Sequence, residues 1–332
     1  MQPDKIIEGV RSISGSAIVN RILQENPDAR GKNEFLFFIK PELLLDDPAI
    51  QTKSVLSIVL EKIGEFGLDI ASVRVLSAGY LEKHRIIAQH YGVINQIASD
   101  ARSNVSEAGK KRFQELFGED FDSATVLGGL EFLKVHPCFS SQALDYLWQN
   151  RKFDKLAGGT YALRLSLDGD PVYLVNGFHA RQLEHFTQPG RSIVVFSLRG
   201  DINWQDARTR FIGATCPADA AEGSIRRVLL ENAGSYGLKA VTPSWNGVHL
   251  SAGPIEGLIE LIRYQSDYES DKALTAADFR FGQQLIEAFG QEKTDWLLTN
   301  PTVEYEGEAV SVFDLTEEKN SEACIDMLQS IR

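Results

Sequence analysis

The sequence feature that most constrains the fold is a run of five consecutive apolar residues, Phe35-Leu36-Phe37-Phe38-Ile39, which ends at Lys40-Pro41. A strand that is apolar at every position has both faces buried, which favours a central place in a sheet. A helical pattern over residues 52–66 follows, and residues 69–76 then alternate between apolar and polar. The chain therefore begins its core as strand, helix, strand.

The same kind of pattern returns near the other end of the chain. Residues 178–186, 204–211 and 254–264 have helical spacing, whereas 193–198 and 246–251 have the composition of strands. The stretch between about 80 and 175 differs, with short helical segments and a hairpin pattern at 161–175. Without that stretch the order is β-α-β, α-β, α-β, α. It predicts an α+β fold, namely a ferredoxin-like split βαβ antiparallel sheet with helices, interrupted by an inserted mixed α/β subdomain.

These patterns predict five segments along the chain. We expect an N-terminal helical extension, a sheet domain in two parts, an inserted subdomain between the parts and a C-terminal extension. Their ranges are 1–33 for the helical extension, 34–91 and 176–264 for the sheet domain, 92–175 for the insertion and 265–332 for the C-terminal extension.

Composition limits the classes of partner. The 332 residues include 34 basic and 46 acidic side chains, a net charge of -12, which argues against nucleic acid or an anionic membrane as the main partner. No apolar run approaches the roughly 18 residues of a membrane span, and the first residues lack the pattern of a secretory signal. The three cysteines are scattered, which is typical of a reduced protein. We therefore expect a cytoplasmic protein.

Two strings carry chemistry. The first, residues 211–226, combines the Thr215 hydroxyl, a turn rich in Pro, Asp and Gly, and Arg226. Hydroxyl and backbone donors beside a guanidinium suit phosphate oxygens, although a helix end followed by a solvated loop has the same composition. Because Arg208, Arg210, Arg226 and Arg227 are concentrated here in an acidic chain, we interpret them as an anion pocket.

The second string is residues 246–254, in which His249 lies in an alternating run that stops at Gly253-Pro254. Glu260 follows eleven residues later in the next helical pattern. A carboxylate that accepts a proton from one imidazole nitrogen leaves the other nitrogen nucleophilic. A structural histidine with satisfied hydrogen bonds is the alternative for this string taken alone.

Taken together and in this order, the strings resemble the nucleoside diphosphate kinase family. The resemblance covers both parts of the sheet domain, which it identifies as a nucleoside diphosphate kinase-like domain. Tyr91, after a helix that ends Gln89-His90, takes the place of an active-site tyrosine, and Phe178 takes the place of a base-stacking phenylalanine. The matching motifs are Lys40-Pro41-Glu42, Gly213-Ala214-Thr215-Cys216-Pro217, Gly223-Ser224-Ile225-Arg226, Asn246-Gly247-Val248-His249 and, downstream, Glu260.

The resemblance implies a transferase that moves the terminal phosphate of a nucleoside triphosphate to a nucleoside diphosphate through a phosphohistidine. It implies Mg²⁺ carried by the nucleotide, no dedicated metal ligands in the protein, and a homo-oligomer. It assigns these roles: His249 as nucleophile, Glu260 orienting its ring, Lys40 and Tyr91 beside the transferred phosphate, Arg226 and Thr215 at the diphosphate, Asn246 at the ribose and Phe178 at the base.

The sequence also departs from the family. Thr209 stands where the family has a second phosphate-binding arginine, so that Arg208 or Arg210 would have to compensate, and Leu250-Ser251-Ala252 replaces Gly-Ser-Asp. A catalytically weakened nucleotide sensor or scaffold of the same fold therefore stays open, as does phosphate relay from His249 to another protein. The remaining histidines are interpreted as ordinary polar or packing residues, and Glu256 and the acidic pairs of the C-terminal extension as solvated faces.

Overall fold

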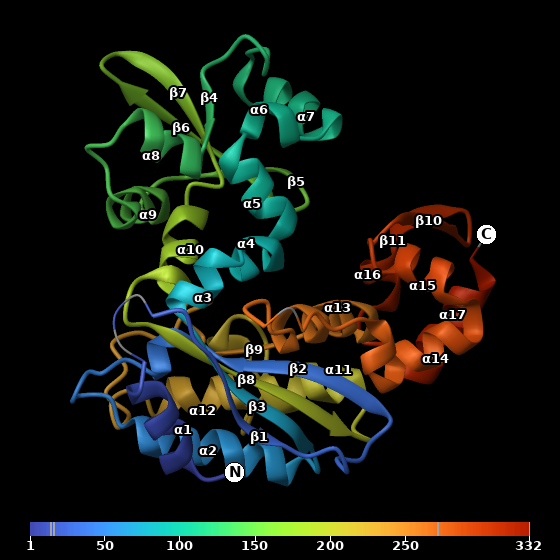
Figure 1. Ribbon diagram of the computed structural model, residues 1–332. Helices are drawn as coiled ribbons and strands as arrows, with labels where there is room; N and C mark the ends of the chain where they lie inside the picture. The colour runs from blue at the N-terminus through green and yellow to red at the C-terminus, as the bar shows by residue number, and fades with distance from the viewer. Residues whose placement is uncertain (14, 16, 271, 332) are drawn as a thin grey trace. The chain divides into compact units, whose positions relative to one another are not determined.

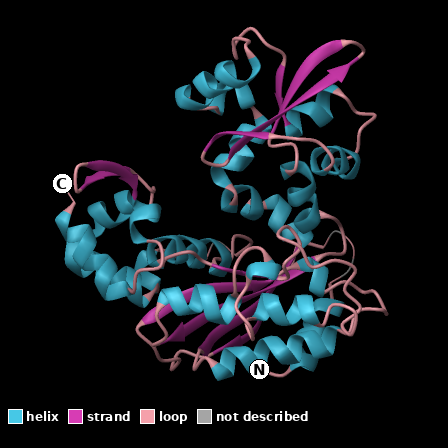
Figure 2. Ribbon diagram, turned by 180° about the vertical axis from the view of Figure 1, so that it is seen from behind, coloured by secondary structure: helices cyan, strands magenta, loops and turns pink. Residues whose placement is uncertain are grey.

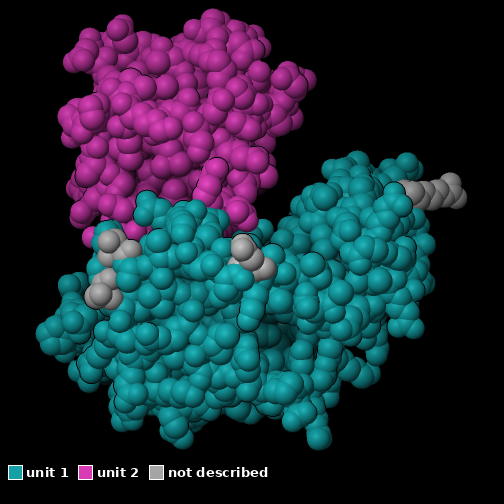
Figure 3. All heavy atoms as spheres, in the orientation of Figure 1, with its two compact units in different colours: residues 1–84, 189–332 teal, residues 85–188 magenta. Residues whose placement is uncertain are grey.

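A computed structural model describes residues 1–13, 15, 17–270 and 272–331. The chain divides into two compact units, coloured separately in Figure 3. The first unit comprises Met1–His84 and Pro189–Arg332, and the second comprises Arg85–Gln188. Each unit has its own sheet and its own hydrophobic core.

The first unit contains a five-stranded sheet in the order β1-β3-β8-β2-β9. All neighbouring strands are antiparallel, so β2 and β3 run parallel to each other on either side of β8. Phe38 lies directly opposite His249 across β2 and β9. The strands are β1 (Asn20–Glu25), β2 (Asn33–Ile39), β3 (Asp69–Ser77), β8 (Ser192–Gly200) and β9 (Val248–Leu250).

Helices cover both faces of this sheet (Figures 1 and 2). On one face, α1 (Pro3–Arg11) and α2 (Thr52–Glu65) share a core with Phe35, Phe37 and Ile39 of β2. On the other face, Tyr264 of α13 (Pro254–Gln265) stacks on Phe38. Every residue of β2 is buried, which confirms the central strand that the apolar run predicts.

Shorter helices connect the strands of the first unit. They are α3 (Ala78–Lys83), α11 (Trp204–Asp206), a π-helix (Ala207–Ile212), α12 (Ile225–Glu231) and the 3-10 helices Pro41–Leu43 and Pro217–Asp219. The helix predicted over 204–211 is thus mostly a π-helix, in which the backbone closes with one extra residue per turn.

The C-terminal extension folds against the same unit. Glu34 of β2 accepts hydrogen bonds from the Phe281 amide and the Arg199 side chain, both at 2.9 Å, and Asn33 accepts one from the Ser321 amide at 3.0 Å. The elements of the extension are the 3-10 helix Ala276–Asp278, α14 (Arg280–Phe289), α15 (Gln291–Leu297), β10 (Thr302–Tyr305), β11 (Glu308–Ser311), α16 (Val312–Thr316) and α17 (Ser321–Ser330).

The second unit contains a four-stranded sheet in the order β4-β7-β6-β5, with β4 parallel to β7. The hairpin predicted at 161–175 is confirmed as β6 and β7. The strands are β4 (Val126–Gly128), β5 (Asp154–Ala157), β6 (Thr160–Leu167) and β7 (Asp170–Val175). The helices are α4 (Ile86–His90), α5 (Gly92–Ser99), α6 (Ala101–Asn104), α7 (Glu107–Phe117), α8 (Gly129–Val135), α9 (Ser141–Gln149) and α10 (His179–Thr187).

The α+β class is confirmed, but the helical extension over 1–33 is wrong. Its helix ends at Arg11, and residues 20–25 form a strand on the edge of β3. Gly15, with φ +53°, lies in the connection between them. The second unit is also longer than the predicted insertion at 92–175, because α4 and α10 pack against α5 inside it.

In the described part of the chain, no helix combines the length and apolar character needed to cross a bilayer.

Candidate active site

The first element of the candidate site is a histidine-carboxylate pair between β9 and α13. His249 lies in the middle of β9, and the break at Gly253-Pro254 turns the chain directly into α13, where Pro254 occupies the first turn. His249 Nε2 is 3.1 and 3.0 Å from the two carboxylate oxygens of Glu260. Glu260 is buried, with 2 % of its surface exposed. In the tautomer in which Nε2 donates to this carboxylate, the ring lone pair is on Nδ1.

Ser251 supports the same carboxylate. Its hydroxyl donates to Glu260 Oε2 at 2.5 Å and is completely buried. Hydrogen bonds donated to a carboxylate favour its ionised form. Glu260 is therefore held as the acceptor that fixes the orientation of His249.

Lys40 forms the second element, at the end of β2. Its Nζ donates to Asn246 Oδ1 at 2.6 Å, and its backbone amide donates to the Gly247 carbonyl. Burial lowers the pKa of Lys40 to about 8; the Glu42 carboxylate opposes this shift, and the Arg226 guanidinium adds to it. Asn246 Nδ2 in turn donates to the carbonyls of Thr215 and Pro243, each at 3.1 Å.

Arg226 forms the third element, in the first turn of α12. It donates to the Gly213 carbonyl at 2.8 Å and to the Val248 carbonyl at 3.0 Å, so that it joins the loop before α12 to β9. Gly213 has φ +89°, and a Cβ there would overlap the Ser224 hydroxyl, so this close loop requires glycine. The Thr215 side chain of the same loop is exposed.

The structure therefore brings together six of the predicted residues: Lys40, Thr215, Arg226, Asn246, His249 and Glu260. The contacts run from Lys40 through Asn246 to the Thr215 loop, and from Arg226 through Val248 to His249. Two cations and a histidine-carboxylate pair thus lie at the adjacent ends of β2 and β9. This arrangement can bind an oxyanion and present a nucleophilic imidazole.

The other three arginines have carboxylate partners. Arg208 lies 3.3 Å from Glu317 and 3.8 Å from Glu318 of the C-terminal extension. Arg210 is exposed and lies 3.6 Å from Asp206, and Arg227 lies 2.6 Å from Glu231. Because each of these three arginines pairs with a different carboxylate, the contacts do not gather the four arginines into the single anion pocket that the sequence predicts. Glu317 and Glu318 keep 46 % and 34 % of their side-chain surface exposed, which agrees with the expected solvated face, although both pair with Arg208.

Tyr91 and Phe178 belong to the second unit. Tyr91 follows α4, and its ring contacts the rings of His179 and Phe186 at 5.7 and 6.5 Å. Phe178 is partly buried and packs against the core of that unit, with its ring 5.6 Å from the Trp148 ring and 6.4 Å from the Tyr161 ring. Their expected roles at the phosphate and the base stay predictions.

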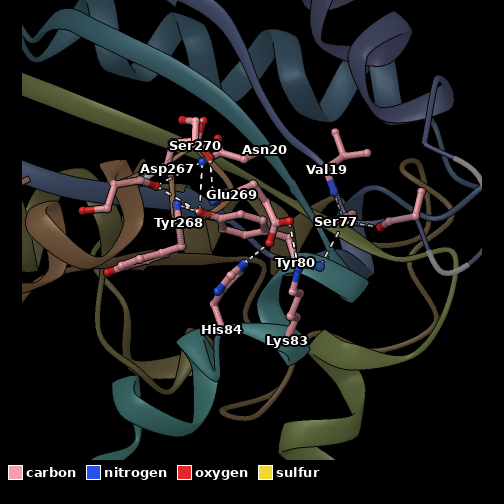
Figure 4. Close-up of polar contacts among 12 residues, drawn as sticks. Val19, Asn20, Ser77, Tyr80, Lys83, His84, Asp267, Tyr268, Glu269 and Ser270 are labelled. Carbon is pink, nitrogen blue, oxygen red and sulfur yellow. Dashed lines mark hydrogen bonds and ion pairs between the residues drawn. The ribbon is translucent and has the colours of Figure 1, made fainter. Parts of the chain in front are cut away.

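Figure 4 shows the surroundings of one histidine that the sequence assigns an ordinary role. The His84 imidazole contacts the Glu269 carboxylate, which also accepts from Lys83 at 2.8 Å, and stacks on Tyr268 at 5.3 Å. The Tyr80 hydroxyl donates to the Ser266 carbonyl at 3.1 Å. These contacts join α3 to the start of the C-terminal extension, so His84 has a structural role.

Sequence reasoning missed three residues around the pair. Phe38 stacks on His249, Ser251 donates to Glu260, and Glu256 is partly buried one turn before Glu260. Burial raises the pKa of Glu256; the Glu260 charge adds to this shift, and Arg208 opposes it. The interpretation of Glu256 as a solvated residue is therefore wrong. Its i, i+4 spacing to Glu260 was the available signal.

No known protein family matches the chain, and no curated protein matches it in sequence. Among solved structures, an apo nucleoside diphosphate kinase from Encephalitozoon cuniculi matches with 14% identity and a TM-score of 0.34, over 73% of this chain and 92% of that one. An NDP kinase from Pyrobaculum aerophilum matches with 18% identity and a TM-score of 0.36, over 73% of this chain and 99% of that one. At these values the matches assign neither a fold nor an activity to the chain.

Proposed function

We propose that this chain is a nucleoside diphosphate kinase-like phosphotransferase that uses His249 as its nucleophile, on a ferredoxin-like split βαβ sheet. The observation that carries the proposal is the buried Glu260, with both carboxylate oxygens within 3.1 Å of His249 Nε2. The motif order in the sequence supports the same activity. The substrates are a nucleoside triphosphate and a nucleoside diphosphate.

The reaction has two half-reactions at one imidazole. The Nδ1 lone pair of His249 forms a bond to the terminal phosphorus of the triphosphate, and the bond from that phosphorus to the bridging oxygen breaks. The diphosphate leaves with the electron pair. In the second half-reaction, a terminal oxygen of the acceptor diphosphate attacks the phosphorus, and the N–P bond breaks. Glu260 stabilises the positive charge that the ring gains in between.

Lys40 and Arg226 supply positive charge for the loose transition state of phosphoryl transfer. Between Arg208 and Arg210, the structure favours Arg208 as the further cation. Arg208 is close enough to lower the pKa of Glu256, one turn from Glu260, whereas Arg210 is exposed beside Asp206. If Arg208 takes the place expected at Thr209, the extra residue that the π-helix takes up would account for the one-residue offset.

Mg²⁺ would arrive with the nucleotide. The side chains that converge at this site are mainly cationic and amide groups, and the nearby Glu42 carboxylate accepts from the Gly247 amide at 2.9 Å. Such a set fits the phosphate oxygens of a Mg²⁺–nucleotide. When bound, the ion neutralises phosphate charge and orients the leaving diphosphate.

Further parts of the proposal concern the second unit and the setting. Tyr91 would contact the transferred phosphate and Phe178 the base, with Thr215 and Asn246 at the diphosphate and the ribose. The protein would act in the cytoplasm as a homo-oligomer, without nucleic-acid or membrane partners.

Incubation with ATP labelled at the γ-phosphate tests the proposal. We expect a protein label that is lost in acid and stable in base, that is absent from His249→Ala, and that is transferred to added GDP. His136→Ala is the matched control, because His136 lies in the second unit after α8. A folded wild type that binds nucleotide but takes no label would instead support the nucleotide sensor. A label that moves to another protein rather than to GDP would support phosphate relay.

A further inference from the structure

The imidazole of His249 is held by a second contact besides its carboxylate. Phe38 lies opposite it across the β2–β9 pair, and the two rings are stacked with centroids 4.5 Å apart and an interplanar angle of 21°. Phe38 is completely buried. Tyr264 of α13 stacks on Phe38 at 5.5 Å and 30°. A helix and two strands therefore contribute one stack of three rings.

The two contacts constrain different properties of the imidazole. The hydrogen bond from Nε2 to Glu260 selects the tautomer and thus the nucleophilic nitrogen. It leaves the plane of the ring weakly determined, because χ2 of histidine is a broad torsion. A rigid aromatic face at 4.5 Å restricts rotation about that torsion.

The plane of the ring matters for in-line attack. The Nδ1 lone pair lies in the imidazole plane, so tilting the ring points it away from the phosphorus. Misplacement of a reacting atom by about 1 Å can reduce a rate by about 10²-fold. A device that fixes the plane therefore acts on the chemical step and not on nucleotide affinity.

We propose that Phe38 is a positioning residue, whose ring fixes the plane of the His249 imidazole for phosphoryl transfer. This inference rests on the proposed function. Phe38 is completely buried and stacks on His249, so its effect passes through that ring. Tyr264 supports the ring from α13, the helix that also carries Glu260.

The test compares Phe38→Leu with Phe37→Leu in the full-length protein. Phe37 is the neighbouring residue on β2 and is equally buried, but it packs with Phe196 and Phe211 on the opposite face of the sheet. The readouts are the rate of acid-labile labelling from ATP, the Kd for ADP, and the ¹⁵N signals of the His249 ring, assigned with His249→Gln.

We expect Phe38→Leu to lower the labelling rate about tenfold with an unchanged Kd for ADP. Its Nδ1 and Nε2 signals should broaden, because a ring that exchanges among several orientations places each nitrogen in several environments. Phe37→Leu should lower the Tm and leave both the rate and the ring signals as in the wild type. Should Phe38→Leu fail to fold, Phe38→Met fills similar volume without a ring and carries the same expectations.

Wild-type rate and ring signals in the Phe38 variants would overturn the inference while leaving the proposed function intact. A rate loss that accompanies a weaker Kd would also overturn it, because that pattern indicates a distorted binding site. If the wild type takes no label, the proposed function fails, and the ring signals alone then decide: signals unchanged by loss of the Phe38 ring contradict the positioning role.

Discussion

At the scale of single residues, the side chain of Lys40 has a pKa close to neutral pH. Burial lowers its pKa to about 8, although Glu42 opposes the shift. A polyanion bound beside Lys40 would favour the protonated amine. We therefore expect affinity for ADP to fall as the pH rises above about 8, by up to about tenfold per pH unit, because binding must then restore a proton.

Isothermal titration between pH 7 and pH 9.5 measures this dependence. Lys40→Arg is the control, since a guanidinium keeps its charge over the whole range. Its affinity should be flat with pH. A wild-type affinity that is equally flat would exclude Lys40 from the phosphate site.

Ser251 gives a second prediction at this scale. Ser251→Ala removes a buried donor from Glu260 and should lower the free energy of unfolding by about 1–3 kcal/mol. It should also slow labelling of His249, because Glu260 is then less firmly held. Ser197→Ala, at a buried serine of β8, is the matched control, and urea denaturation with labelling kinetics provides both measurements. Equal labelling rates in the two variants would contradict a role for Ser251 at the site.

Residues of the site could be predicted where their side-chain type and their order in the sequence indicate a chemical role. His249, Glu260, Lys40 and Asn246 could be singled out because ionisable and amide side chains interrupt apolar patterns. Phe38 could not be, because an aromatic residue within an apolar run has no signal that separates packing from positioning. Its role depends on which residue lies opposite it, and strand register is a tertiary property.

At the scale of elements, α13 carries a carboxylate whose charge opposes folding. The pKa of Glu256 is raised above its ordinary value of 4.5 by burial and by Glu260. The folded chain then holds a proton that the unfolded chain has lost. Stability therefore falls as the pH rises from about 4.5 toward the raised value.

Glu256→Gln should remove this dependence. We expect its Tm to equal that of the wild type near pH 4 and to exceed it by about 2 °C at pH 8, which corresponds to roughly 1 kcal/mol. Glu61→Gln, at an exposed position of α2, should leave the Tm curve unchanged. Thermal scans across the pH range show the difference, and a lower Tm for Glu256→Gln at pH 8 would mean that the charged form of Glu256 is stabilising.

The contact between the π-helix and the C-terminal extension leads to a further prediction. Arg208 is ion-paired with Glu317 and Glu318, so a bound phosphate would compete with these carboxylates. The double variant Glu317→Gln, Glu318→Gln should bind ADP about threefold more tightly, within the usual range for exposed ion pairs. Glu304→Gln with Glu306→Gln, on the β10–β11 hairpin, is the matched control, and unchanged affinity in the first pair would place Arg208 outside the site.

Helices and strands were predicted well where a single pattern of apolar residues extends over the whole element, as in β2, α2, β8 and α13. The two failures have physical causes. Residues 20–25 fit either a helical or an alternating strand pattern, and their antiparallel pairing with β3 makes them a strand. The π-helix is followed directly by Gly213, which Arg226 holds through a contact between residues thirteen apart, and helical spacing in the sequence does not separate a π-helix from an α-helix.

At the scale of the whole molecule, the boundaries of the two units follow packing rather than composition. The sequence predicts an insertion over 92–175, whereas the compact unit runs over Arg85–Gln188. Tyr91 directly follows α4, and Phe178 directly precedes α10. Helical patterns on either side of a boundary look alike in sequence, so only the contacts they make could assign them.

This division makes the predicted roles of Tyr91 and Phe178 testable in the intact chain. Two units with separate cores should unfold in two calorimetric transitions. Phe196→Leu and Phe113→Leu, in the cores of the first and second units, identify which transition belongs to which unit. A ligand stabilises only the unit to which it binds, and the gain is about 2.7 kcal/mol when the ligand concentration is one hundred times its Kd.

If both units contact the nucleotide, saturating ADP should raise both transitions. Tyr91→Phe together with Phe178→Leu should then abolish the shift of the second transition and leave that of the first. If ADP raises the first transition alone in the wild type, Tyr91 and Phe178 do not bind nucleotide. The whole site would in that case lie in the first unit, where the described contacts already join Lys40, Arg226 and His249 through β9 and its flanking loops.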